Sequence, residues 1–166
     1  MRGMTTEFRV MVTGHRPNKL GGYGASPPQQ CVREWLREQL NTYRARRYDL
    51  IAITGMALGV DQWFAWEANG LGIPFDAYVP CDGQDSLWPT TSRTSYRELL
   101  WRARTVVQVS PGPFTPEKMQ RRNEAMVHSA HAHLAIWNGS RGGTANCIKF
   151  MRSIGVEPII FDPKEQ

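Results

Sequence analysis

The sequence predicts an α/β fold in which a mainly parallel sheet carries helices on both faces. Short apolar and β-branched runs alternate with amphipathic helical patterns along the chain, which is the order that right-handed crossovers require. The Leu-Ile-Ala-Ile run within residues 49–54 is unbroken, as expected of a central parallel strand buried on both faces. The chain has 166 residues, of which 41% are hydrophobic, so it can enclose one core. We therefore expect one Rossmann-like domain spanning residues 1–166.

The first half of the chain predicts three strands and two helices. Residues 8–14 form a β-rich run that ends in glycine. A loop follows, and Ser26 then precedes two prolines, which predicts a helix N-cap and a first helical turn. That helix reaches about residue 46, because apolar residues recur at spacings of three and four on one face. Further predicted elements are a strand at 49–54, a helix from the segment 55–61 to about 71, and a strand at 73–80.

The second half continues the alternation. A polar loop at residues 81–91 and a proline-rich loop at residues 110–116 separate the predicted elements. These elements are a helix at 92–103, a strand at 105–109, a helix at 117–129, a strand at 134–137, a helix at 144–154 and a strand at 156–161.

Charge and cysteine content limit the function classes. The chain carries a net charge of +5 and a pI near 9.4, which suits either nucleic acid or an anionic small ligand. The basic residues form only short clusters without a lysine tract, so nucleic acid is not the favoured partner. Three scattered cysteines predict neither a disulfide framework nor a zinc site, and the histidines at 128–133 have irregular spacing. Neither a metal nor a cofactor is predicted.

The sequence shows neither a membrane-spanning segment nor a signal peptide, and this predicts the cellular location. No apolar run reaches the roughly 18 residues that span a bilayer, so no membrane partner is expected. Residues 1–7 contain no apolar signal-peptide core. We therefore expect a cytoplasmic protein.

Three glycine-rich turns follow predicted strands, and we expect them to converge. They comprise Gly14-His15-Arg16, the segment Gly55–Asp61 and the segment Gly139–Thr144. Ligands of such sheets bind beyond the carboxyl ends of the strands, where the strand order reverses. The third turn opens a helix, so its free backbone N–H groups predict a phosphate site, to which Arg141 could add charge. Neither a Gly-x-Gly-x-x-Gly segment nor a Walker loop is present.

Individual side chains suggest roles at this edge. His15 and Arg16 suit a phosphate, whereas Lys19 suits the surface. Asp61 caps a helix, binds ribose hydroxyls or acts as a general base. Trp88 either stacks on a base or anchors its loop. The predicted ligand-binding residues are Gly14, His15, Arg16, Gly55, Gly59, Asp61, Gln84, Trp88, Arg122, Asn123, Gly142, Gly143 and Thr144.

Five motifs in order carry a family resemblance. They are Thr13-Gly-His-Arg-Pro17 with Lys19-Leu-Gly-Gly-Tyr23, Gly55-Met-Ala-Leu-Gly-Val-Asp61, Gln84 with Trp88, Arg122-Asn-Glu-Ala-Met126 and Gly142-Gly-Thr144. Together they resemble the YpsA-like proteins, a branch of the SLOG superfamily. That superfamily also contains the DNA-processing protein DprA and the LOG phosphoribohydrolases. The resemblance implies a Rossmann-like fold with a nucleotide-type pocket at the strand ends.

One departure separates the chain from the LOG-type enzymes. Their glycine motif continues as Gly-Thr-x-x-Glu, and its glutamate takes part in glycosidic cleavage. Here Gly143-Thr144 is followed by Ala145-Asn146-Cys147, without a carboxylate to stabilise an oxocarbenium centre. The catalytic residue is therefore unknown, and if the chain hydrolyses a nucleotide, Asp61 would have to serve.

Three functions remain open at this point. The leading hypothesis is binding of a nucleotide or nucleotide-derived ligand. The alternatives are an N-glycosidic (phosphoribo)hydrolase acting on nucleotides and a DprA-like module for single-stranded nucleic acid. The resemblance also raises a homodimer as an alternative to a monomer.

Overall fold

A computed structural model describes residues 6–22, 25–47 and 49–165 of the chain. Tyr23, which belongs to one of the motifs above, lies outside these residues, as does Gly24 of the same predicted loop. The strands are β1 (Phe8–Gly14), β2 (Leu50–Thr54), β3 (Phe75–Val79), β4 (Thr105–Gln108), β5 (Ala132–Ile136) and β6 (Ile159–Phe161). The helices are α1 (Pro27–Arg44), α2 (Val60–Gly70), α3 (Thr90–Arg102), α4 (Pro116–Ser129) and α5 (Gly143–Ser153), with short 3₁₀ helices η1 (Pro17–Lys19) and η2 (Pro163–Glu165).

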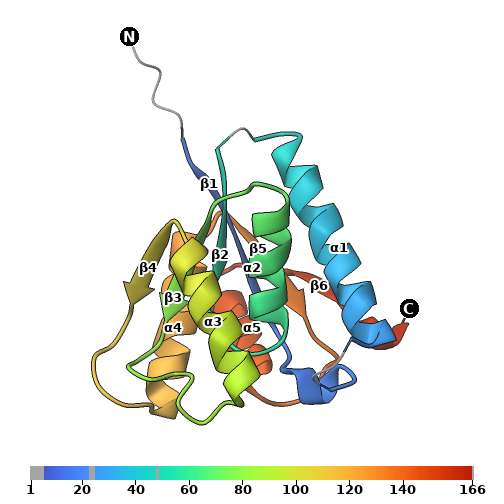
Figure 1. The fold of residues 1–166 in the computed structure, drawn as a ribbon. Coiled ribbons are helices and arrows are strands. Elements are labelled where there is room, and N and C mark those ends of the chain that lie inside the picture. Colours follow the sequence, from blue (N-terminus) through green and yellow to red (C-terminus); the bar gives the residue numbers. More distant parts are fainter. Residues whose placement is uncertain (1–5, 23–24, 48, 166) are drawn as a thin grey trace.

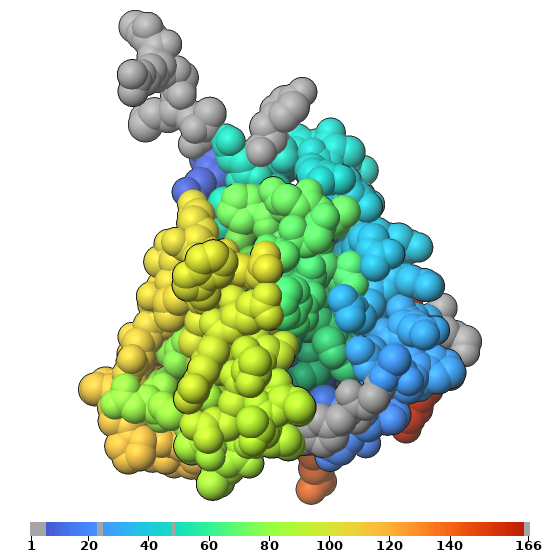
Figure 2. Space-filling model, viewed as in Figure 1, coloured from blue at the N-terminus to red at the C-terminus, as the bar shows by residue number. Residues whose placement is uncertain are grey.

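The strands of the described residues form one parallel sheet in the order β4-β3-β2-β1-β5-β6. Helices α1, α2 and α3 cover one face, and α4 and α5 cover the other (Figure 1). The side chains of α1, α2 and α3 make up most of the face seen in Figure 2. This arrangement confirms the predicted Rossmann-like α/β fold.

The strand order reverses at β1. From β1 the chain builds β2, β3 and β4 on one side, and α4 then returns it to the other side, where β5 pairs with β1. Val10 of β1 accordingly pairs with Ala52 of β2 and with Ala132 of β5. A crevice therefore opens beyond the carboxyl ends of β1 and β5, the place where such folds bind ligands.

Two apolar clusters hold the layers together. The larger lies between the sheet and α1, α2 and α3, and includes Val32, Leu36 and Leu40 of α1. All five residues of β2 are buried, as its unbroken apolar pattern predicted. The smaller cluster, under α4 and α5, includes Met11, Met126 and Cys147. The sheet is thus fixed on both faces, and its carboxyl edge is a rigid base for the loops.

The structure differs from the sequence prediction mainly at the starts of two strands and at one loop. β5 begins at Ala132 rather than at residue 134, and β6 begins at Ile159 rather than at residue 156, whereas β4 agrees with its predicted span to within one residue. The segment after β1, predicted as a loop, contains the 3₁₀ helix η1, because Pro17 favours a helical first turn. None of the helices in the described ranges is long and apolar enough to cross a bilayer.

Candidate functional site

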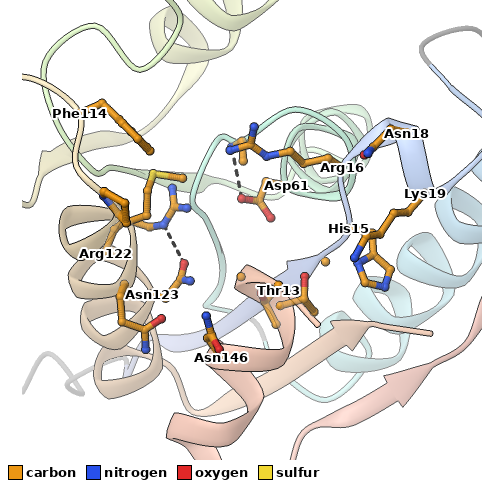
Figure 3. A pocket seen from close by; sticks show the side chains of 18 residues that line it. Thr13, His15, Arg16, Asn18, Lys19, Asp61, Phe114, Arg122, Asn123 and Asn146 are labelled. Carbon is orange, nitrogen blue, oxygen red and sulfur yellow. Dashed lines mark hydrogen bonds between the residues drawn. The ribbon is translucent and has the colours of Figure 1, made fainter. Parts of the chain in front are cut away.

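A cavity of about 460 Å³ lies beyond the carboxyl ends of β1 and β5 (Figure 3). Its volume falls within the range of small-molecule sites. The lining comes from β1, η1, the start of α2, the first half of α4 with the loop before it, and the start of α5. Its residues are Thr13, Gly14, His15, Arg16, Asn18, Lys19, Ala57, Asp61, Phe114, Pro116, Met119, Gln120, Arg122, Asn123, Gly142, Gly143, Thr144 and Asn146. Two of the three predicted glycine turns thus contribute lining glycines, and the segment between Gly55 and Asp61 contributes Ala57 and Asp61.

The N-terminus of α5 opens into this cavity. Gly142 is the N-cap with φ of 142°, and none of the described side chains caps the helix. The backbone N–H groups of the first turn therefore keep their capacity to bind an anion, and the helix dipole adds partial positive charge. A Cβ built on Gly143 would meet no atom of the described residues within 4 Å. The glycine at this position leaves space that the described protein does not fill.

Lys19, predicted to lie on the surface, lines the cavity from η1. It is exposed, and its Nζ atom donates hydrogen bonds to Ser140 Oγ at 2.8 Å and to the Arg141 carbonyl oxygen at 3.0 Å. The side chain of Arg141 is exposed and lies outside the lining. The cation that lines the cavity beside the glycine turn is therefore Lys19 and not Arg141.

His15 lines the cavity but is tied to the loop after β5. It is buried, and its Nε2 atom lies 2.9 Å from Asn138 Oδ1 and 3.1 Å from the Asn138 backbone nitrogen. Burial, followed by the positive charge of Lys19, lowers the pKa of His15 below its usual value. A neutral ring that joins the ends of β1 and β5 contributes mainly to the shape of the site.

Asp61 is the carboxylate of the cavity. It lies in the first turn of α2, is only 7% exposed, and accepts a hydrogen bond from the Ala57 backbone N–H at its Oδ2 atom (3.2 Å). Burial raises the pKa of Asp61 to about 6, against the opposing charges of Arg122 and Arg16 and the Ala57 hydrogen bond. Figure 3 shows the Arg16 side chain extending over Asp61. No described residue donates to Oδ1, so this atom is free for a ligand.

Arg122 projects from α4 and is 3% exposed. Its Nε atom donates to Asn123 Oδ1 at 2.9 Å, and its Nη1 atom donates to the Gly55 carbonyl oxygen. Gln84 Oε1 lies 3.5 Å from the same Nη1 atom. Within residues 6–22, 25–47 and 49–165, nothing accepts a hydrogen bond from Nη2. A buried guanidinium with donors to spare, on the wall of a cavity, is suited to an anionic or hydroxyl-bearing ligand.

Gly55 and Gly59, predicted as ligand contacts, lie outside the lining. A Cβ on Gly55 would lie 2.6 Å from Arg122 Cζ, and one on Gly59 would lie 2.7 Å from the His15 carbonyl oxygen. Gly59 also has φ of 92°, which disfavours other residues. Gly14 does line the cavity, but a Cβ there would lie within 2.7 Å of Val60. These glycines allow the walls of the site to approach one another closely.

The predicted aromatic residue, Trp88, also lies outside the lining. Its ring packs edge-on against Tyr96 with 5.1 Å between centroids, next to the larger core cluster. Gln84 contacts the site only through Arg122. The aromatic residue of the lining is instead Phe114, in the proline-rich loop before α4. The sequence held one signal for it, an aromatic residue between two prolines in a loop that follows a strand.

A metal centre has no support in the described part of the chain, where no group of three or more His, Cys, Asp or Glu side chains could hold a metal ion. Two of the histidines at 128–133 contact the backbone. His131 Nδ1 accepts from the Arg9 backbone N–H, and His133 Nε2 lies 3.0 Å from the Val127 carbonyl oxygen.

Residues 10–153 match the family model YpsA, described as the YspA SLOG family. The chain belongs to this SLOG family. The matched span includes every residue that lines the cavity. An uncharacterized SPbeta prophage-derived protein, YoqJ of Bacillus subtilis strain 168, is 33% identical over 116 residues, covering 60% of this chain and 68% of YoqJ.

Solved structures share the fold of this SLOG protein. DNA processing protein A from Helicobacter pylori, which binds single-stranded DNA, aligns with a TM-score of 0.66 at 16% identity, over 96% of this chain and 71% of that one. DNA processing protein A from Streptococcus pneumoniae aligns with a TM-score of 0.53 at 14% identity, over 92% of this chain and 58% of that one. At these identities the likeness concerns the fold.

The helix that follows the glycine turn carries a thiol near the position where LOG-type enzymes of the superfamily carry an acid. Cys147 is fully buried in the smaller core cluster, and burial raises the pKa of its thiol to about 11. A neutral thiol in the core cannot serve as the anion of a cleavage reaction. In this SLOG chain, Asp61 is the carboxylate that faces the cavity.

Proposed function

We propose that the cavity binds a nucleotide or a nucleotide-derived anion. The observation that carries the proposal is the uncapped N-terminus of α5, which opens onto a cavity lined by three cationic side chains and one carboxylate. The cations are Arg16, Lys19 and Arg122, and the carboxylate is Asp61. Helix N-termini and forked guanidinium groups favour phosphate. Membership of the SLOG family supports this ligand class at a general level.

The lining suggests where each part of such a ligand sits. A phosphate fits against the backbone N–H groups that open α5, with Lys19 and Arg16 supplying full charges. The free Oδ1 atom of Asp61 suits a sugar hydroxyl, since a carboxylate oxygen accepts such a hydrogen bond. Asn123 and the unused donors of Arg122 extend this polar wall. His15 shapes the site through Asn138.

Isothermal titration calorimetry with nucleoside 5′-monophosphates, NAD and ADP-ribose tests the proposal. We expect Arg16→Ala and Lys19→Met each to weaken binding about tenfold or more, because each removes a charge-assisted contact. Lys149→Met is the matched control, since Lys149 is exposed on α5 and lies outside the lining. No heat with any compound, or equal affinity for the Arg16 variant and the parent, contradicts the proposal.

A second function, N-glycosidic hydrolysis of a nucleotide, is favoured by the state of Asp61. Its pKa of about 6 lies near neutrality, which suits a general acid or base, and its Oδ1 atom is free. The test is chromatographic detection of free base released from nucleotides by micromolar protein. Release that Asp61→Asn abolishes supports hydrolysis. Absence of release over hours leaves binding as the function.

Single-stranded DNA is the third ligand to be tested, because DNA processing protein A from Helicobacter pylori binds it. Protein binding releases counterions from the backbone phosphates of DNA, and this release makes the affinity depend steeply on salt. A mobility shift with a single-stranded oligonucleotide that fades as salt rises would support this alternative. No shift at low salt would end it.

A further inference from the structure

Phe114 presents an aromatic ring at the cavity. Its side chain is 55% exposed, although burying an aromatic ring would be favourable. Pro116 and Met119, from the first turns of α4, also line the cavity. The apolar wall formed by Phe114, Pro116 and Met119 contrasts with the positive charge offered by Lys19, by Arg122 and by the uncapped start of α5. The cavity therefore has one side for an anion and another for an uncharged, flat group.

The loop that carries Phe114 is held in place by hydrogen bonds. Lys118 Nζ donates to the carbonyl oxygens of Pro111 at 2.7 Å and Pro113 at 2.6 Å. Gly112 N–H donates to Asp82 Oδ2 at 3.0 Å, and Asp82 N–H donates to the Gly112 carbonyl oxygen at 2.9 Å. These contacts fix the backbone immediately before Phe114. Because this backbone is already fixed, the loop that carries Phe114 needs little ordering when a ligand binds.

The opposite side of the opening carries Arg16. Figure 3 places Phe114 and Arg16 on different sides of the cavity, with Asp61 below the end of the Arg16 side chain. A planar guanidinium also stacks on aromatic rings, so a flat ring bound against Phe114 would have a favourable second neighbour. Trp88 cannot take this role, because its ring is packed against Tyr96 outside the lining.

We infer that Phe114 is the base-stacking residue of the site, and that the ligand carries a nucleobase in addition to its phosphate. The inference rests on the proposed nucleotide function and deepens it. It assigns the apolar wall to the base and the α5 wall to the phosphate. A sugar phosphate without a base would leave the Phe114 ring exposed, and would therefore bind less tightly than the matching nucleotide.

The experiment compares ligands with and without a base. Calorimetric titration of the full chain uses the four common nucleoside 5′-monophosphates, ribose 5-phosphate and inorganic phosphate. We expect Phe114→Ala to weaken binding of the preferred nucleotide about five- to hundredfold, the range that base–aromatic stacking supplies. Binding of ribose 5-phosphate should stay within about twofold, and Phe114→Trp should restore nucleotide affinity. Leu87→Ala is the control, because Leu87 is 96% exposed and lies outside the lining.

The possible outcomes distinguish failure of the stacking role of Phe114 from failure of the proposed nucleotide binding. Equal affinity of the parent for ribose 5-phosphate and for every nucleotide would overturn the role of Phe114 and leave phosphate binding in place. An equal loss for both ligand types in Phe114→Ala would do the same. A change in sedimentation without a change in nucleotide affinity would identify Phe114 as a subunit contact and would also overturn the inference. Absence of binding to all of these probes, and to NAD and ADP-ribose as well, would overturn both proposals.

Discussion

The guanidinium group of Arg122 occupies the space that a side chain at Gly55 would need. A Cβ on Gly55 would lie 2.6 Å from both Cζ and Nη1 of Arg122, and Nη1 donates a hydrogen bond to the Gly55 carbonyl oxygen. A buried cation is thus seated directly against the end of β2. A glycine after β2 leaves room for the Arg122 guanidinium, which lines the wall of the cavity.

Replacing Gly55 by alanine should therefore displace Arg122. We expect Gly55→Ala to lower the free energy of unfolding by about 1–3 kcal/mol, the usual cost of overpacking, and to weaken nucleotide binding as well. Denaturant unfolding and calorimetry measure the two effects. Gly70→Ala is the control, because a Cβ on Gly70 would meet nothing within 4 Å. Unchanged stability and affinity in Gly55→Ala would show that Arg122 is not held by this contact.

Because the pKa of Asp61 is raised, we expect the stability of the fold to depend on pH. The pKa rises from 3.8 to about 6 on burial, so the folded protein holds this proton more tightly than the unfolded chain. Protonation of Asp61 therefore stabilises the folded state; this contribution is fully present below about pH 3.8 and is lost as the pH rises through 6. Asp61→Asn stays neutral throughout. Between pH 4 and pH 7.5, we expect the parent to lose about 1–3 kcal/mol of unfolding free energy relative to Asp61→Asn.

Denaturant unfolding of both proteins across this pH range checks the prediction. The titration of His15, whose pKa is lowered, is present in both proteins and cancels to first order in the comparison. Parallel stability curves for the parent and Asp61→Asn would contradict a raised pKa at Asp61. They would also remove the main support for hydrolysis.

The sequence predicted the fold well because strand and helix periodicities are local. The unbroken apolar pattern of β2 and the serine–proline start of α1 each gave an element within a few residues of its bounds. The convergence of the strand ends also followed, since parallel strands place their carboxyl ends at one edge. The bounds of β6 were harder to predict, because this strand pairs on one side only and its sequence pattern does not set a boundary.

The roles of single residues were harder to predict, because they depend on tertiary contacts that the spacing of residues in the sequence does not reveal. Trp88 and Phe114 both lie in polar or proline-rich loops, and only the packing of Trp88 on Tyr96 separates them. Lys19 and Arg141 are both cations near the glycine turn, but η1 directs Lys19 across to the β5–α5 loop. Gly55 resembles a phosphate-binding glycine in sequence, whereas the structure uses it to admit Arg122.

Substitutions at Gly142 and Gly143 test separately whether each glycine is needed for ligand affinity or for the stability of the fold. Gly143 begins α5, and a Cβ there would meet nothing within 4 Å, so we expect Gly143→Ala to leave the melting temperature unchanged. The added methyl group would stand on the cavity lining beside the free N–H groups of the helix. Affinity for a nucleotide should therefore fall about tenfold, equivalent to roughly 1.4 kcal/mol.

Gly142→Ala is the companion variant, because its φ of 142° strains any other residue. We expect it to lower the free energy of unfolding by about 1–3 kcal/mol. Thermal melting and calorimetry then give two different signatures for adjacent glycines, with stability lost at Gly142 and affinity lost at Gly143. Parental affinity in Gly143→Ala would mean that the ligand does not approach the N-terminus of α5, because a methyl group there would otherwise stand between the phosphate and the backbone donors.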